Sequence, residues 1–85
     1  MQIIYSPKFV RKYKRLPDNI KDKAEKAEHI FRINPFNSAL KTHKLTGKFK
    51  NFYSFSIDYK YRIIFEFEDR NTVYFHSVGD HSVYQ

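Results

Sequence analysis

Three side chains in the second half of the chain carry groups that phosphate chemistry uses: Arg62, His81 and Tyr84. An arginine holds phosphate oxygens with a planar fork of N–H donors, and a histidine gains and loses a proton near neutral pH. A tyrosine can stack on a nucleobase. None of the three needs a metal ion. By position alone, a solvated strand arginine, a loop histidine and a tyrosine that anchors the tail also fit the pattern.

His43, which precedes Lys44-Leu45-Thr46-Gly47, is a second candidate for proton transfer. His29 is expected to be an exposed helix residue, and His76 is expected to pack within a strand. No pair of histidines has the spacing of helical metal ligands, and no carboxylate cluster accompanies them. The sequence therefore predicts neither a metal site nor another cofactor.

Positive charge is concentrated in the first half of the sequence. Residues 1–50 contain thirteen Lys or Arg and four acidic residues, whereas residues 51–85 contain three and five. A basic helix face is often only solvated, but this density favours contact with a polyanion such as RNA, DNA or an acidic protein. The cations expected to make that contact are Lys8, Arg11, Lys12, Lys14, Arg15, Lys44 and Lys60.

Length and composition limit what class of protein the chain can be. Its 85 residues suffice for one domain, over residues 1–85, and are too few for two. The absence of cysteine excludes disulfides and thiolate metal sites and fits a reducing compartment. No apolar run is long enough to cross a bilayer, and the N-terminus lacks a signal-peptide pattern. We therefore expect a soluble cytoplasmic protein whose core is rich in aromatic rings.

The elements that must position these side chains begin with a strand and a helix. A β-prone run over residues 1–5 ends at Ser6-Pro7. Ser6 is a good helix N-cap, and Pro7 suits the first helical position because its missing N–H is not needed there. This helix should end near Leu16-Pro17, with an apolar side facing the core and cations on the other.

A second helix is expected to follow at once. Asp18 can serve as its N-cap, and Asn34-Pro35 should end it because a residue before proline is pushed out of the helical region. Apolar residues at helical spacing form one stripe, which consists of Ile20, Ala24, Ala27 and Phe31. With so short a link, the two helices should form an antiparallel hairpin.

Three segments of the second half alternate apolar and polar residues, as strands with one buried face do. They cover residues 53–58, 61–68 and 72–78 and are separated by short turns. Consecutive strands with such connections form an antiparallel meander. The predicted fold is α+β in the order βααβββ, with the helical hairpin packed on one face of the sheet and the other face left for function.

The expected site lies on the face of the sheet without helices. Arg62 should point to that face, because side chains alternate along a strand and its neighbour Ile63 belongs to the apolar set. Gly79 permits a sharp bend at the end of the last strand. A hairpin register between the last two strands could then bring His81 and Tyr84 close to Arg62.

Several short motifs stand in a specific order along nearly the whole chain. They are IIYSPKF at 3–9, HKLTG at 43–47, YRIIF at 61–65 and VGDHSVY at 78–84, with the helix pair between the first two. Together they resemble the RelE/ParE toxins of bacterial and archaeal type II toxin–antitoxin systems, in particular the RelE, YafQ and YoeB branch. The resemblance implies the βααβββ fold, inhibition by a cognate antitoxin and, in many members, cleavage of messenger RNA in the ribosomal A site.

The resemblance also implies roles for individual residues. Arg62 resembles the phosphate-contacting arginine of the family's Tyr-Arg-aliphatic strand, and His81 resembles the catalytic histidine near the C-terminus of the YafQ and YoeB branches. Tyr84 resembles the late aromatic residue that orients the scissile nucleotide. His43 resembles the histidine of a His-x-Leu-Thr-Gly segment.

The chain departs from the family on the strand before the arginine. Where RelE has lysines, this chain has Ser54 and Ser56, which leaves the identity of the general base open. The expected reaction is attack of a 2′-hydroxyl on the adjacent phosphorus, with Arg62 stabilising the charge and His81 and His43 moving protons. The ribosome would supply much of the orientation, because positioning can account for a large part of a barrier.

Two other functions fit the same fold. One is a ParE-like toxin that poisons DNA gyrase and cleaves nothing, and the other is an inactive module that binds RNA or an antitoxin. The pair of Arg62 and His81 favours the ribonuclease, since the gyrase-poisoning branch generally lacks it. The expected partners are messenger RNA, ribosomal RNA and an antitoxin with an acidic, partly disordered segment that forms a hetero-oligomer with the toxin.

Overall fold

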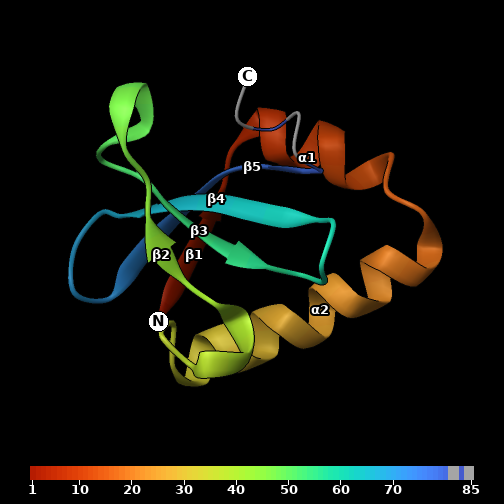
Figure 1. The fold of residues 1–85 in the computed structure, drawn as a ribbon, viewed down its shortest axis with the longest axis horizontal. Coiled ribbons are helices and arrows are strands. Elements are labelled where there is room, and N and C mark those ends of the chain that lie inside the picture. The colour runs from red at the N-terminus through yellow and green to blue at the C-terminus, as the bar shows by residue number, and fades with distance from the viewer. Residues whose placement is uncertain (81–82, 84–85) are drawn as a thin grey trace.

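Two helices and a five-stranded sheet make up the part of the chain that the computed structural model describes, which is residues 1–80 and 83 (Figure 1). The α+β class and the predicted element order are confirmed. In chain order the elements are β1 (Gln2–Tyr5), α1 (Pro7–Lys14), α2 (Asp18–Ile33), η1 (Ser38–Leu40), β2 (His43–Lys44), η2 (Gly47–Phe49), β3 (Tyr53–Ser56), β4 (Arg62–Phe67) and β5 (Thr72–Gly79).

The strands are arranged in the order β1-β5-β4-β3-β2. β3, β4 and β5 are antiparallel neighbours and form the predicted meander. β1 lies parallel to β5, so the sheet is mixed, and the additional strand β2 pairs with β3 through His43 and Lys44. A strand of two residues is too short to show alternation, and for this reason the sequence pattern does not indicate β2.

The cap signals of the sequence explain most of the helix bounds. Ser6 Oγ accepts a hydrogen bond from the Phe9 N–H at 2.8 Å and caps α1 as predicted. The cap of α2 is Pro17, and Asp18 is the first helical residue instead of the N-cap. Its carboxylate still lies in the first turn, where the helix dipole favours negative charge. Among residues 1–80 and 83, no helix is long and apolar enough to span a membrane.

The core lies between the helices and one face of the sheet. The four residues of the predicted stripe on α2 are all buried. Phe31 is completely buried, and its ring stacks on Phe55 at a centroid distance of 4.8 Å and meets Phe65 edge-on at 4.9 Å. Phe9 of α1 packs against Phe75 at 5.5 Å. Both helices therefore cover the same face, as predicted.

The opposite face is less open than predicted. Ser54, Ile64 and Ser77 lie side by side across β3, β4 and β5 on that face, and each is at most 1% exposed. The ring of Phe52, just before β3, lies 4.9 Å from the ring of His76 on β5. Because β4 separates these two strands, Phe52 must cross over β4. The expectation of a free face is therefore wrong at its centre.

Candidate functional site

Arg62 opens β4 on the face away from the helices. Its neighbours across the sheet are Ser56 on β3 and Gly79 on β5. The Arg62 side chain is half-buried, and its Nη1 donates a hydrogen bond to Ser56 Oγ. One strand neighbour thus orients the guanidinium group, while its other N–H donors can serve a ligand.

A hollow of about 200 Å³ adjoins the Arg62 side chain, and Lys41 and Ser56 are among its lining residues. Lys41 follows η1 with a left-handed backbone, at a φ of 52°. This conformation is uncommon for a residue with a side chain. No pattern in the sequence indicates Lys41, because only the tertiary fold brings the loop before β2 next to β3. The hollow therefore contains two cations from different segments.

Asp58 also lines this hollow, but the turn after β3 engages its carboxylate. It accepts backbone hydrogen bonds from Tyr61 at 2.7 Å and Lys60 at 2.9 Å, and Lys23 forms an ion pair with it at 3.7 Å. Burial alone would raise the pKa of Asp58, but these hydrogen bonds and the Lys23 charge lower it below the usual value. Asp58 is therefore a turn-forming carboxylate and a poor general base near neutral pH.

His43 lies on the same face of the sheet as Arg62. It opens β2 opposite Ser54, and Ser54 and Ser56 alternate on one side of β3. The His43 ring is exposed, and its Nδ1 lies 3.1 Å from the carbonyl oxygen of Lys41. If Nδ1 carries the proton of that contact, Nε2 is left as an acceptor. In the described part of the chain, no group of three or more His, Asp or Glu is placed to hold a metal ion.

His81 and Tyr84, the two predicted site residues from the C-terminal segment, lie outside the described residues. The last residue of β5, Gly79, precedes this segment and pairs with Arg62. Val83 N–H donates to the Asp80 carbonyl at 3.0 Å, so the chain turns after β5 as predicted. Gly79 is not in the left-handed region, and a Cβ there would meet Val83 at 3.6 Å, an ordinary contact. The turn therefore does not depend on glycine at this position.

The predicted cations divide between different surfaces. Lys12 of α1 and Arg15, which caps the C-terminal end of α1, line a hollow of about 220 Å³ together with Gly79 and Asp80, next to the end of β5. Partial burial, followed by the charge of Lys8, lowers the pKa of Lys12. The remaining predicted cations are exposed at other places on α1, on β2 and in the turn before β4: Lys8, Arg11, Lys14, Lys44 and Lys60. Lys12 and Arg15 thus lie close to Gly79 and Asp80 at the end of β5.

A second cavity, of about 480 Å³, is a mainly apolar groove between α1 and α2. Its apolar lining includes Tyr5, Phe9, Val10 and Tyr13. The two helices run in roughly opposite directions, as expected of a hairpin (Figure 1). Side chains of both helices line the groove. Lys14 lies on its α1 side, and Glu25 and Glu28 lie on its α2 side.

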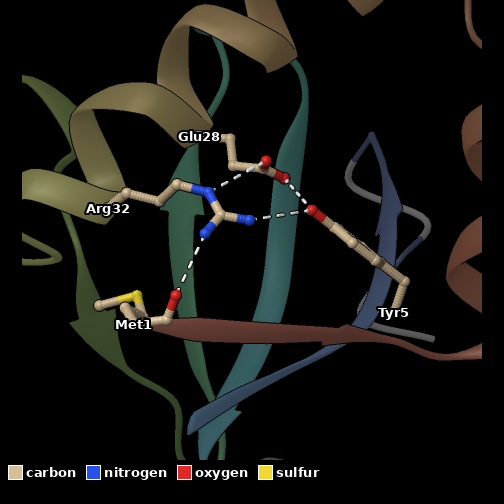
Figure 2. Close-up of polar contacts among 4 residues, drawn as sticks. All are labelled: Met1, Tyr5, Glu28 and Arg32. Carbon is tan, nitrogen blue, oxygen red and sulfur yellow. Dashed lines mark hydrogen bonds and ion pairs between the residues drawn. The ribbon is translucent and has the colours of Figure 1, made fainter. Parts of the chain in front are cut away.

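A polar network fastens β1 to α2 at one end of the groove (Figure 2). The Tyr5 hydroxyl donates to Glu28 at 2.9 Å, and Arg32 forms an ion pair with Glu28 at 3.5 Å. Arg32 also donates to the Met1 carbonyl at 3.2 Å. Burial, reinforced by the hydrogen bond to Glu28, raises the pKa of the Tyr5 hydroxyl. The network fixes the Tyr5 side chain in the groove wall.

The sequence matches one protein family over nearly its full length. Residues 3–83 match the family model described as "ParE toxin of type II toxin-antitoxin system, parDE". No curated protein sequence gives a significant match.

Solved structures share the fold at low sequence identity. YafQ from E. coli strain BL21(DE3) has a TM-score of 0.81 at 17% identity, over 98% of this chain and 96% of that chain. The YoeB/ParE toxin from Agrobacterium tumefaciens has a TM-score of 0.79 at 15% identity, over 95% of this chain and 99% of that chain. A chain of the RelB-RelE antitoxin-toxin complex from Methanococcus jannaschii has a TM-score of 0.75 at 23% identity, over 95% of this chain and 94% of that chain. At these identities the likeness establishes the fold alone.

Proposed function

The chain belongs to the ParE toxin family of type II toxin–antitoxin systems, and from this membership and the Arg62 site we propose that it is a metal-independent endoribonuclease that cleaves messenger RNA on the ribosome. The observation that carries the proposal is the hollow that Arg62, Lys41 and Ser56 line together. Two cations around a half-enclosed space suit a phosphodiester, because the reaction increases negative charge on the phosphate oxygens.

The proposed reaction assigns a role to each side chain. Arg62 binds the scissile phosphate, and its bond to Ser56 Oγ holds the guanidinium in position. Lys41 supplies a second positive charge, in place of the lysines that the RelE strand carries where Ser54 and Ser56 stand here. In this proposal, Lys41 compensates for the absence of lysines at positions 54 and 56.

Proton transfer is assigned to the histidines. The 2′-hydroxyl attacks the adjacent phosphorus, and the bond from phosphorus to the 5′-oxygen breaks. His43 accepts the 2′-hydroxyl proton at Nε2, because its Nδ1 faces the Lys41 carbonyl. His81 returns a proton to the leaving 5′-oxygen, and Tyr84 orients the nucleotide. The ribosome holds the message in line for attack, and the exposed cations of α1 bind ribosomal RNA.

The test is to map the 5′ ends of cellular transcripts after brief induction of the protein. The parent chain is expected to arrest growth and to cut messages within coding regions. Arg62→Ala and His81→Ala should each abolish both effects. Arg70→Ala removes an exposed arginine from the turn after β4 and is the matched control, which should keep both effects. Toxicity that persists in Arg62→Ala with intact messages would contradict the proposal.

A gyrase poison is the alternative that the family description itself favours, since the matched family is named for ParE. In that case the induced cells should contain broken DNA and uncut messages. The same transcript map, combined with an assay for gyrase-linked DNA breaks, separates the two functions.

We propose further that an antitoxin segment neutralises the toxin by binding the groove between α1 and α2. Solved structures with this fold include the RelB-RelE complex and a YoeB-YefM complex from Staphylococcus aureus, both of which pair a toxin with its antitoxin. The groove combines apolar walls with a charged rim, which suits an amphipathic segment. Val10→Asp should escape neutralisation by the cognate antitoxin, whereas Arg11→Asp, one residue away on α1, should stay neutralised.

A further inference from the structure

Four half-buried rings form a continuous row across the second face of the sheet. Phe49 of η2 meets Phe52 at a centroid distance of 6.3 Å, Phe52 meets His76 at 4.9 Å, and His76 meets Tyr74 at 6.4 Å. Each of the four keeps part of its surface open to solvent. We call these four side chains the ring row.

The backbone of β5 helps to expose one member of the row. The register between β4 and β5 shifts between Ile64 and Phe65: Ile64 pairs with Ser77, while Phe65 pairs with Phe75. His76 is the extra residue of this bulge. A bulge re-aims a side chain relative to the regular pleat, and such irregularities are frequent next to binding sites. The packing of the core does not require an imidazole at this point.

Positive charge lies at the Phe49 end of the ring row and beside His76. Lys48 Nζ stands 5.3 Å from the centroid of the Phe49 ring. Partial burial and the charges of Lys8 and Lys12 lower the pKa of His76, so its ring is mainly neutral at pH 7. One acid, Glu66, pairs with Tyr74 on the same face. The row thus combines neutral ring faces with three flanking lysines.

We infer that the ring row is a stacking subsite for bases of single-stranded RNA that lie a few nucleotides away from the phosphate held at Arg62. The inference rests on the proposed ribonuclease function. Aromatic platforms bordered by cations bind single strands without strong sequence preference, because every base has a flat face and every nucleotide a phosphate. An acidic peptide would satisfy the lysines but would leave the ring faces unused.

The distance along the sheet suits a short strand of RNA. Arg62 and Glu66 lie on the same side of β4, four residues apart, and Glu66 is the neighbour of Tyr74. At about 3.3 Å per residue, this separation is about 13 Å. A few extended nucleotides can therefore reach from the Arg62 hollow to the ring row.

The experiment compares two fluorescent oligomers of equal length and charge. One is a 2′-O-methyl oligouridylate, which cannot be cleaved, and the other has the same backbone without bases. The full-length protein should bind the oligouridylate at least about five-fold more tightly than the abasic oligomer, because stacking on one ring is worth that much or more. His76→Ser and Phe49→Ser should each lose most of this preference.

Three control variants make the result specific to the ring row. His76→Phe keeps a ring and should keep the preference. Phe36→Ser removes an exposed ring that packs on Tyr53 and Phe67, away from the row, and should also keep it. Arg62→Ala should weaken the binding of both oligomers by the same factor, because it acts on the phosphate.

Two results would overturn the inference. One is equal affinity of the parent protein for both oligomers. The other is that both His76→Ser and Phe49→Ser keep the preference for the oligouridylate over the abasic oligomer. If these variants then weaken only the antitoxin complex, the row is a protein-binding surface, and the inference is equally wrong. The binding assay does not depend on cleavage. Equal affinity of the parent for both oligomers, together with intact message cleavage, therefore contradicts the ring row alone. The absence of cleavage in the parent contradicts the proposed function alone.

Discussion

The two faces of the sheet use the same kind of side chain in opposite ways. On the helix face, Phe31, Phe55, Phe65 and Phe75 are completely buried against one another. On the second face the aromatic rings are half-open, and the small Ser54, Ser77 and the aliphatic Ile64 are the buried residues. Alternating residues of β3, β4 and β5 contribute to both sets, to which α2 adds Phe31 on the helix face and the segment before β3 adds Phe49 and Phe52 on the second face. A change on the helix face should therefore alter stability, and a change on the second face should alter binding or catalysis.

Phe31→Ala, on the helix face, should have the largest effect on stability. Loss of this ring, which contacts three other phenylalanines, should lower the free energy of unfolding by about 3–5 kcal/mol. Urea titration of the purified protein measures the change. The control is Phe36→Ala, whose ring is 57% exposed and should cost less than about 1 kcal/mol. Equal losses in the two variants would contradict the proposed division of the rings.

Arg62→Ala should have the next largest effect, and on activity instead of stability. Message cleavage should fall about 100-fold or more, which corresponds to about 2.7 kcal/mol of transition-state stabilisation. The free energy of unfolding should change by less than about 1 kcal/mol, because the group makes one side-chain hydrogen bond and is half-exposed. Cleavage assays and urea titration on the same preparation test both statements. A loss of activity that merely follows a loss of folded protein would disprove the assignment.

Ser77→Ala should stabilise the protein, although it lies on the second face. The Ser77 hydroxyl is buried and has no hydrogen-bond partner among the described residues. An unsatisfied buried hydroxyl costs about 1 kcal/mol or more, so its removal should raise the free energy of unfolding by about that amount. Ser54→Ala is the matched control on the neighbouring part of the sheet, since Ser54 is buried but has an interaction partner. That variant should not gain stability.

The pH dependence of His76 should give the smallest effect. Burial, followed by Lys8 and Lys12, lowers the pKa of the folded state below the ordinary value of about 6.5. The unfolded chain therefore binds the proton more readily, and stability falls as the pH drops from above 6.5 through the lowered pKa. His76→Phe should lose less stability than the parent between pH 7.5 and pH 5.5 in thermal melts. A steeper loss in the variant would reverse the assigned sign.

Local patterns in the sequence predict the parts of the fold that depend on neighbouring residues. The stripe of α2, the cap at Ser6 and the outward side of Arg62 all follow from helical or strand periodicity and are found as predicted. The parallel partner of β1 and the pairing of β2 depend on contacts between distant segments. Periodicity contains no information on such contacts, and so these features appear only in the structure.

The candidate site shows the same limit. The side of the sheet that carries Arg62 follows from a period of two, whereas Lys41 enters the site from a loop with no regular pattern. The partial closure of the second face by Phe52 is equally invisible to alternation, because the residue precedes its strand. The roles of His81 and Tyr84 remain predictions from the family resemblance.

The pairing of β1 with β5 also bears on when the toxin becomes active. β1 finds its parallel partner only at residues 72–75, and Ser6 bonds to the His76 carbonyl 70 positions away. During synthesis β5 must therefore emerge before the first strand can join the sheet, because the N-terminal segment is made long before its partner. A nascent chain still short of β5 has neither a closed core nor a formed Arg62 site. Under the proposed function, the ribosome that makes this protein would therefore be protected from it until β5 has been synthesised.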